Sequence, residues 1–236
     1  ALLALPLVAT AQTPTPTPPP FASDERPFFV APASVADPGG ADSFLFNPAG
    51  LGLDRGGEFA FLSSDRFDKK LPGDGTGLFW KTGGPLHLGM EWARPAEEID
   101  VTLFHFGTTM SLGGQTAIGA AYVSNLGLGD VRYDNWSGGF LTRPSRFMAL
   151  GATIWNAQED PAAPGLDLRA RYVGGVAIRP LGNERFTLTA DVAKTDSQKG
   201  EDLRMSARLM PFDGISLFGT VDESDRWTAG LTLSFT

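Results

Sequence analysis

Cysteine is absent from the 236 residues of the chain, and charged residues are scarce at 19%. Without cysteine, neither a disulfide framework nor a cysteine-ligated metal site can form. The formal net charge of −8 argues against a nucleic-acid partner, because a phosphate-binding surface must be basic. No stretch of about 18 consecutive apolar residues occurs, so the sequence predicts no membrane-spanning helix.

Histidine is nearly absent as well, since His87 and His105 are the only two in the chain. Both fall on the expected inward faces of strands, near Glu91, and a metal site usually needs three protein ligands. A catalytic site needs a nucleophile, a base and a third group that orients the base, and the sequence shows no such set. We therefore predict no catalytic residues, no metal site and no cofactor, and we do not expect an enzyme.

What the chain does contain is alternation of apolar and polar residues with a period of two. The pattern is clearest from Arg226 to Phe235, where Trp227, Leu231 and Phe235 share one face and threonine, glycine and serine occupy the other. Many such stretches are as long as a tilted membrane strand. We expect twelve strands, near 58–66, 75–82, 86–94, 100–111, 115–125, 131–142, 146–157, 168–179, 185–195, 201–210, 214–221 and 226–235.

The connections between these stretches alternate in length along the chain. Tight connections fall at 81–86, 112–114, 143–145, 181–184 and 211–213, and longer polar ones lie between them. Short turns at one end and longer loops at the other are typical of outer-membrane barrels. The sequence therefore predicts an all-β, antiparallel transmembrane β-barrel of about twelve strands with an N-terminal plug-like segment. A soluble sandwich or propeller also has many short strands and is the alternative.

The chain before residue 58 has a different composition. Residues 1–11 are apolar and end in a small-x-small pattern, so we interpret them as the remnant of a signal peptide. Residues 12–20 contain alternating threonine and proline, which predicts an extended linker. Residues 21–57 are expected to form the plug-like segment, with one helical turn at 47–51, and residues 58–236 the barrel.

Two motifs resemble those of known bacterial outer-membrane proteins. The stretch from Val35 to Leu53 is similar to the N-terminal region of FadL-like and PorV-like barrels, in which Asn-Pro-Ala-Gly-Leu, here at 47–51, precedes the first strand. The tail at 228–235, T-x-G-x-x-L-x-F, resembles the C-terminal signal of outer-membrane barrels. This resemblance implies a location in the bacterial outer membrane, contact with its lipid, and assembly by the barrel-assembly machinery.

The same resemblance implies two functions. The FadL-like group implies passive, porin-like transport or binding of small hydrophobic or amphipathic molecules, with the N-terminal segment as a plug. The PorV-like group implies a structural or docking barrel that anchors other cell-envelope or secretion proteins. The loops are mostly polar and short, which favours transport or a purely structural role.

Alternation also predicts which residues face the interior. The inward residues are small or apolar on the fourth, fifth and seventh stretches and charged on the eighth to tenth. The candidate ligand-binding residues are Arg171, Arg179, Asp191, Arg204 and Arg208. The candidate plug residues are Asp37, Asp42, Asn47 and Pro48.

An apolar wall that faces a cationic wall suits an amphipathic ligand with an acidic head. We expect its carboxylate to bind Arg204 or Arg208, and Asp37 and Asp42 to hold these arginines when no ligand is present. Alternatively, the charges fill a solvated interior by pairing with one another or with the acidic N-terminal segment. Asp191 and Arg204 belong to one hairpin and are expected to pair directly or one step off register.

Overall fold

The structure, a computed structural model, contains twelve strands and two short helices among the residues that it describes. These residues are 34–38, 40–53, 57–64, 74–82, 84–96, 99–113, 115–126, 134–158, 170–195, 201–213, 215–222 and 227–233. Both helices are 3-10 helices: η2 covers Ala41–Leu45 and η3 covers Pro48–Gly52. In the described part of the chain, no helix has the length and apolar character needed to cross a membrane.

The strands follow the predicted stretches closely. They are β1 (Glu58–Ser64), β2 (Asp74–Lys81), β3 (Leu86–Ala96), β4 (Ile99–Gly113), β5 (Thr116–Ser124), β6 (Asp134–Ser145), β7 (Met148–Trp155), β8 (Arg171–Ile178), β9 (Phe186–Thr195), β10 (Asp202–Phe212), β11 (Ile215–Asp222) and β12 (Trp227–Leu233). The weakest predicted stretch, 131–142, forms β6 although glycine and serine interrupt its alternation. This strand pairs on both sides, with β5 and with β7.

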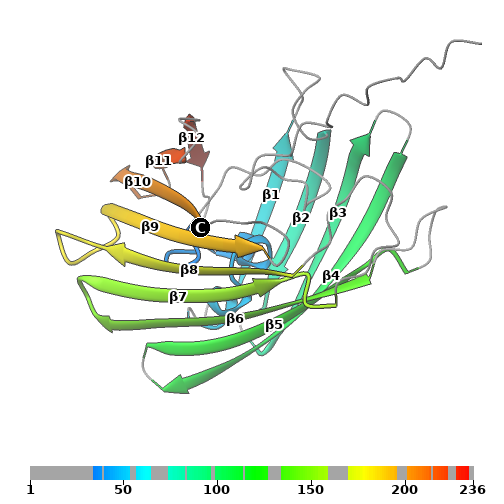
Figure 1. Cartoon of the computed structure of the whole chain (residues 1–236), viewed down its shortest axis with the longest axis horizontal. Helices are drawn as coiled ribbons and strands as arrows, with labels where there is room; N and C mark the ends of the chain where they lie inside the picture. Colours follow the sequence, from blue (N-terminus) through cyan, green and yellow to red (C-terminus); the bar gives the residue numbers. More distant parts are fainter. Residues whose placement is uncertain are drawn as a thin grey trace, which may run out of the picture.

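All twelve strands belong to one sheet, and their order in the sheet is their order in the sequence. Each neighbouring pair is antiparallel. This arrangement confirms the predicted all-β antiparallel fold of the barrel type, because a sandwich divides its strands between two sheets. The sheet curls, as Figure 1 shows, with β1 and β12 as its two edges. No ladder among the described residues joins these edges, so the closure expected of a barrel is not seen in the described pairings.

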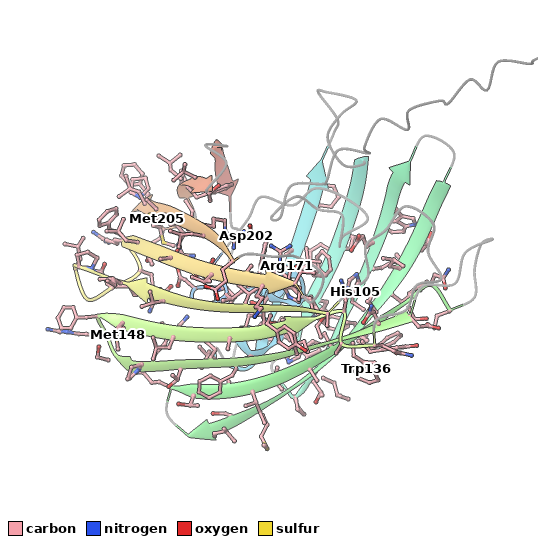
Figure 2. All side chains as sticks on the ribbon, viewed as in Figure 1. His105, Trp136, Met148, Arg171, Asp202 and Met205 are labelled. Carbon is pink, nitrogen blue, oxygen red and sulfur yellow. The ribbon has the colours of Figure 1, made fainter. Side chains whose placement is uncertain are left out.

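The two faces of the sheet carry different side chains, as the alternation predicted. Large apolar side chains are exposed on the outer face, including Phe59, Phe61, Trp80, Leu88, Phe106, Ile118, Trp136, Phe140, Leu150, Tyr172, Leu188, Leu203, Met205 and Leu217. The inner face holds small, polar and charged side chains together with a few large apolar ones, such as Phe79, Leu103 and Leu141, and most of them are buried. Figure 2 shows the difference, with Trp136 and Met148 outside the curve and Arg171 and His105 inside it.

The described residues between 34 and 53, which we call the inner segment, lie inside the curve of the sheet (Figure 1). Phe44, Phe46 and Leu51 of this segment pack with Phe79 of β2 and Ala121 of β5. The hydrophobic core therefore lies between the inner segment and the inner face of the sheet. The predicted signal remnant 1–11, the linker 12–20, residues 21–33 of the predicted plug and the terminal Phe235 lie outside the described residues.

Candidate functional site

Glycines on the inner face allow the inner segment to approach the backbone of the sheet. A Cβ added at Gly139 of β6 would collide with the side-chain oxygen of Asn47, and one at Gly119 of β5 would collide with the backbone of Pro48. These two glycines lie directly opposite each other in the β5–β6 ladder. The same relation holds in the β7–β8 ladder. Gly151 of β7 and Gly175 of β8 are opposite each other, and a Cβ added at either would contact Val35. We call these four residues, Gly119, Gly139, Gly151 and Gly175, the glycine row.

Asn47 fixes the position of the inner segment on the glycine row. Its side-chain nitrogen donates to the carbonyl oxygen of Val35 at 2.7 Å and to that of Phe140 in β6 at 3.0 Å. Its side-chain oxygen accepts from the amide of Ala49 at 3.1 Å and caps η3, with Pro48 at the first position of the helix. The helical turn predicted at 47–51 is thus present, and its cap also binds the sheet.

Asp37 of the inner segment forms ion pairs with two arginines of the sheet. Arg179 Nη2 lies 2.6 Å from one carboxylate oxygen of Asp37, and Arg208 Nη2 lies 2.6 Å from the other. Asp37 is 6% exposed and Arg179 5%, so the first of these pairs is largely removed from water. Charge-assisted hydrogen bonds in such surroundings are strong, and removal of one partner leaves a buried charge uncompensated.

Two further residues extend this ion-pair cluster beyond the predicted set. Glu184, in the β8–β9 turn, lies 3.3 Å from Arg179 and 3.5 Å from Arg143 of β6. Arg143 alternates in step with Gly139 and Leu141 of β6, which face inward. The alternation of the sequence therefore contained a signal that the Arg143 side chain also faces inward. Glu184 lies in a turn, where alternation carries no information about side-chain direction.

Asp191 and Arg204 form a second, separate pair. They are directly opposite in the β9–β10 ladder, which is one of the two expected arrangements, and Arg204 Nη2 lies 2.8 Å from the Asp191 carboxylate. Ser34 donates its hydroxyl to the other oxygen of Asp191 at 2.7 Å. Ser34 carries no signal in the sequence, because the inner segment has no regular alternation.

Arg171 stands apart from both pairs. It is at the start of β8, whereas Arg179 follows the end of that strand, and its guanidinium carbon lies 5.8 Å from the centroid of the Trp155 ring. The five candidate ligand-binding residues are therefore all on the inner side of the sheet but divide into three places. Of the candidate plug residues, Asp37, Asn47 and Pro48 contact the sheet, and the side chain of Asp42 lies outside the described part.

The two histidines lie at the opposite wall, around Phe44 of the inner segment. His87 Nε2 lies 3.0 Å from the Thr109 hydroxyl, and His105 Nε2 lies 2.9 Å from the Glu91 carboxylate. The hydroxyl and the carboxylate thus contact different histidines, so neither ring has both a nucleophile and an orienting acid among the described residues. No group of three potential metal ligands occurs in that part of the chain either. The expectation that the chain is not an enzyme stays a prediction.

The ion-pair cluster around Asp37 contains further buried hydrogen-bond donors. The Nε–H groups of Arg179 and Arg208 are buried and have no acceptor among the described residues. A buried donor without an acceptor is unfavourable, since its desolvation is not offset by a hydrogen bond. This wall of the sheet is thus suited to bind a carboxylate or another anionic oxygen group, and Asp37 occupies that position.

Comparison with known proteins gives only a distant structural likeness. No protein-family model and no curated protein sequence matches the chain. A triple mutant of Rhodopseudomonas blastica porin aligns with a TM-score of 0.45 and 16% identity, over 70% of this chain and 56% of the porin chain. Another structure of an engineered protein, described in terms of asymmetric conductivity, aligns over the same shares with a TM-score of 0.44 and 15% identity. The fold described above rests on the strand pairings and not on these values.

Proposed function

We propose that the chain is a bacterial outer-membrane β-barrel that passively transports or binds small amphipathic molecules with an acidic head. The membrane location is supported by the outer face, where large apolar side chains are exposed along most strands. A protein dissolved in water rarely exposes so large an apolar surface, whereas a barrel in a bilayer must. The FadL-like resemblance of residues 35–53 agrees with this proposal.

The observation that carries the ligand class is the bound carboxylate of Asp37. Two arginine side chains of the sheet each lie 2.6 Å from it, and their Nε–H groups have no acceptor in the described part of the chain. In this proposal a ligand carboxylate replaces that of Asp37, and the inner segment withdraws. The apolar part of the ligand then lies along small residues such as Ala117 and Ala149, which Ala49 and Ala36 now cover.

Competition between ligand and inner segment is directly testable. Asp37→Asn removes the competing carboxylate, so we expect a dansyl-labelled undecanoic acid to bind the detergent-solubilised barrel about tenfold more tightly. Arg208→Ala removes one charge-assisted hydrogen bond and should weaken binding about tenfold or more. Fluorescence titration of each variant measures both effects.

Two controls separate this effect from a general change in charge. Asp213→Asn removes an exposed acid in the β10–β11 turn, near the same end of the sheet, and should leave binding unchanged. The methyl ester of the probe should bind weakly to every variant, because it lacks the carboxylate. Deletion of residues 21–57 should raise passive leakage from vesicles that contain the barrel. If the acid binds none of the variants and the deletion leaves leakage unchanged, the transport function is wrong.

The second candidate is a structural or docking barrel that anchors other envelope proteins. It is favoured by the glycine row, which seats the inner segment so closely that the segment serves as a permanent part of the core. In that case Asp37→Asn should destabilise the barrel without any gain in ligand binding.

A further inference from the structure

Two neighbouring tight connections pack against each other and place arginines at the end of the sheet where the tight turns lie. The β6–β7 and β8–β9 turns are joined by a hydrogen bond from the Arg179 amide to the Phe147 carbonyl at 2.8 Å. Gly182, with a φ of +65°, lets them approach: an added Cβ would lie 3.0 Å from the Phe147 ring and 3.2 Å from Arg146 Nε. The side chain of Arg146 therefore lies over the adjacent turn.

Arg146 and Arg185, both exposed, form no ion pair with any described residue. The nearby Glu184 is engaged by Arg143 and Arg179, at 3.5 Å and 3.3 Å. Two further acids of this end are exposed, Asp213 in the next tight turn and Glu58 at the start of β1. The tight-turn end of the sheet thus presents cations that no described residue neutralises.

Exposed apolar side chains accompany these cations. Phe147 is 45% exposed, Leu181 63% and Phe212 71%, and all three lie in or beside the tight connections. The Arg146 guanidinium carbon lies 4.7 Å from the centroid of the Phe147 ring. An apolar side chain beside a cation is typical of the membrane interface, where the first enters the acyl region and the second reaches the headgroups.

The longer connections differ in composition from the tight ones. Those at 65–73, 97–98, 127–133, 159–169, 196–200 and 223–226 together contain more acidic than basic residues. An exposed cation near one end of a membrane strand adjoins the headgroups of one leaflet only, and Arg146 and Arg185 both lie at the tight-turn end.

We infer that the β6–β7 and β8–β9 turns form a binding site for the headgroup of an anionic phospholipid in the leaflet next to the tight turns. Arg146 and Arg185 contact the phosphodiester, and Phe147 and Leu181 insert beside the acyl chains. Arginine suits this role, because its planar guanidinium binds phosphate oxygens through two N–H groups. The inference rests on the proposed membrane location.

The test uses the full chain reconstituted in phosphatidylcholine vesicles with a small fraction of spin-labelled phosphatidylglycerol or spin-labelled phosphatidylcholine. Electron paramagnetic resonance measures the lipid immobilised by the protein. We expect immobilised phosphatidylglycerol to exceed phosphatidylcholine, and the joint change Arg146→Gln and Arg185→Gln to reduce that preference by about fivefold for each arginine. High salt should weaken the preference in the unaltered protein.

Two matched variants complete the design. Joint replacement of Arg146 and Arg185 by lysine keeps the charge and should keep most of the preference. Lys194→Gln removes an exposed cation of β9, opposite Tyr172 and at the far end of the sheet, and should have little effect. Equal immobilisation of both lipids by the unaltered protein, or a preference that survives the double glutamine change, overturns the headgroup site alone. A chain that does not float with either kind of vesicle overturns the proposed membrane location and the headgroup site together.

Discussion

Gly174 and Gly175 follow each other in β8 but face opposite sides of the sheet. A Cβ added at Gly174 would meet no atom within 4 Å, whereas one at Gly175 would collide with the Asp191 carboxylate and lie 2.9 Å from the Val35 side chain. The two positions therefore differ in their surroundings and not in their strand or their depth. They form a matched pair for testing whether the inner segment really lies against the glycine row.

We expect Gly175→Ala to destabilise the protein by about 1–3 kcal/mol, because the added methyl collides with the Asp191 carboxylate and overpacks the contact with Val35 of the inner segment. Gly174→Ala should be neutral or stabilising by about 0.5 kcal/mol, since it only restricts the unfolded chain. Urea unfolding in detergent measures both. In the cysteine-free chain, a Ser43→Cys reporter should react faster with maleimide in the Gly175→Ala background only. Equal stability and equal labelling of the two alanine variants would show that the segment does not occupy the row.

The sequence predicted the face of the sheet on which a charged residue lies better than it predicted the partner of that residue. Parity alone placed Arg179, Asp191 and Arg204 on the inner side, because period-two alternation is a local property of a strand. The pairing of Asp191 with Arg204 was expected, because both belong to one hairpin. Their contacts with the inner segment were not, because these join residues that are distant in sequence. The path of the inner segment brings Ser34 to Asp191 and Asp37 to Arg179, and nothing in the alternation of the strands encodes that path.

At the scale of the secondary-structure element, β4 is the longest strand and offers two outward positions at different depths. Phe106 lies near the middle of β4 and is 42% exposed, and Leu112 lies near its tight-turn end and is 54% exposed. By alternation, both side chains lie on the outer face of the sheet. If the outer face contacts lipid, a charge at the first position lies in the hydrocarbon, and a charge at the second lies near the headgroups.

Phe106→Arg should lower the free energy of unfolding in lipid vesicles by about 2–4 kcal/mol, and Leu112→Arg by about 0–1 kcal/mol. The difference arises because an arginine near the interface can extend to water. Guanidinium titration followed by tryptophan fluorescence measures the two values. Costs that are similar at both positions would mean that the outer face of β4 does not cross a bilayer.

The strands were the most predictable elements of the chain. Alternation of side chains and tight turns are both local, so the twelve stretches and their order could be deduced without any knowledge of contacts. The 3-10 helix η2 was not predicted, because Ala41–Leu45 has neither a side-chain cap nor a repeating apolar pattern. Its position is set by Phe44 and Leu45, which pack into the hydrophobic core on the inner face of the sheet.

For the whole molecule, the barrel fold and the apolar outer face lead to a simple prediction. The detergent-extracted protein should be rich in β-structure by circular dichroism, and it should migrate differently on a gel before and after boiling. The reason is that a meander with a full set of neighbour ladders resists dodecyl sulfate until heat separates the strands. A chain that stays dissolved and monodisperse without detergent contradicts the proposed membrane location.

The position of the inner segment also determines the order in which the molecule can be built. The segment precedes every strand in the chain, yet its contacts extend from Phe79 in β2 to Arg208 in β10. Its complete binding surface does not exist until β10 has joined the sheet. The inner segment is thus synthesised before the strands that bind it, and its docking closes a long chain loop, which is a slow kind of contact to form. During this interval Phe44, Phe46 and Leu51 lack the surface that buries them in the folded protein, and exposed apolar side chains of this kind make a folding intermediate prone to aggregation.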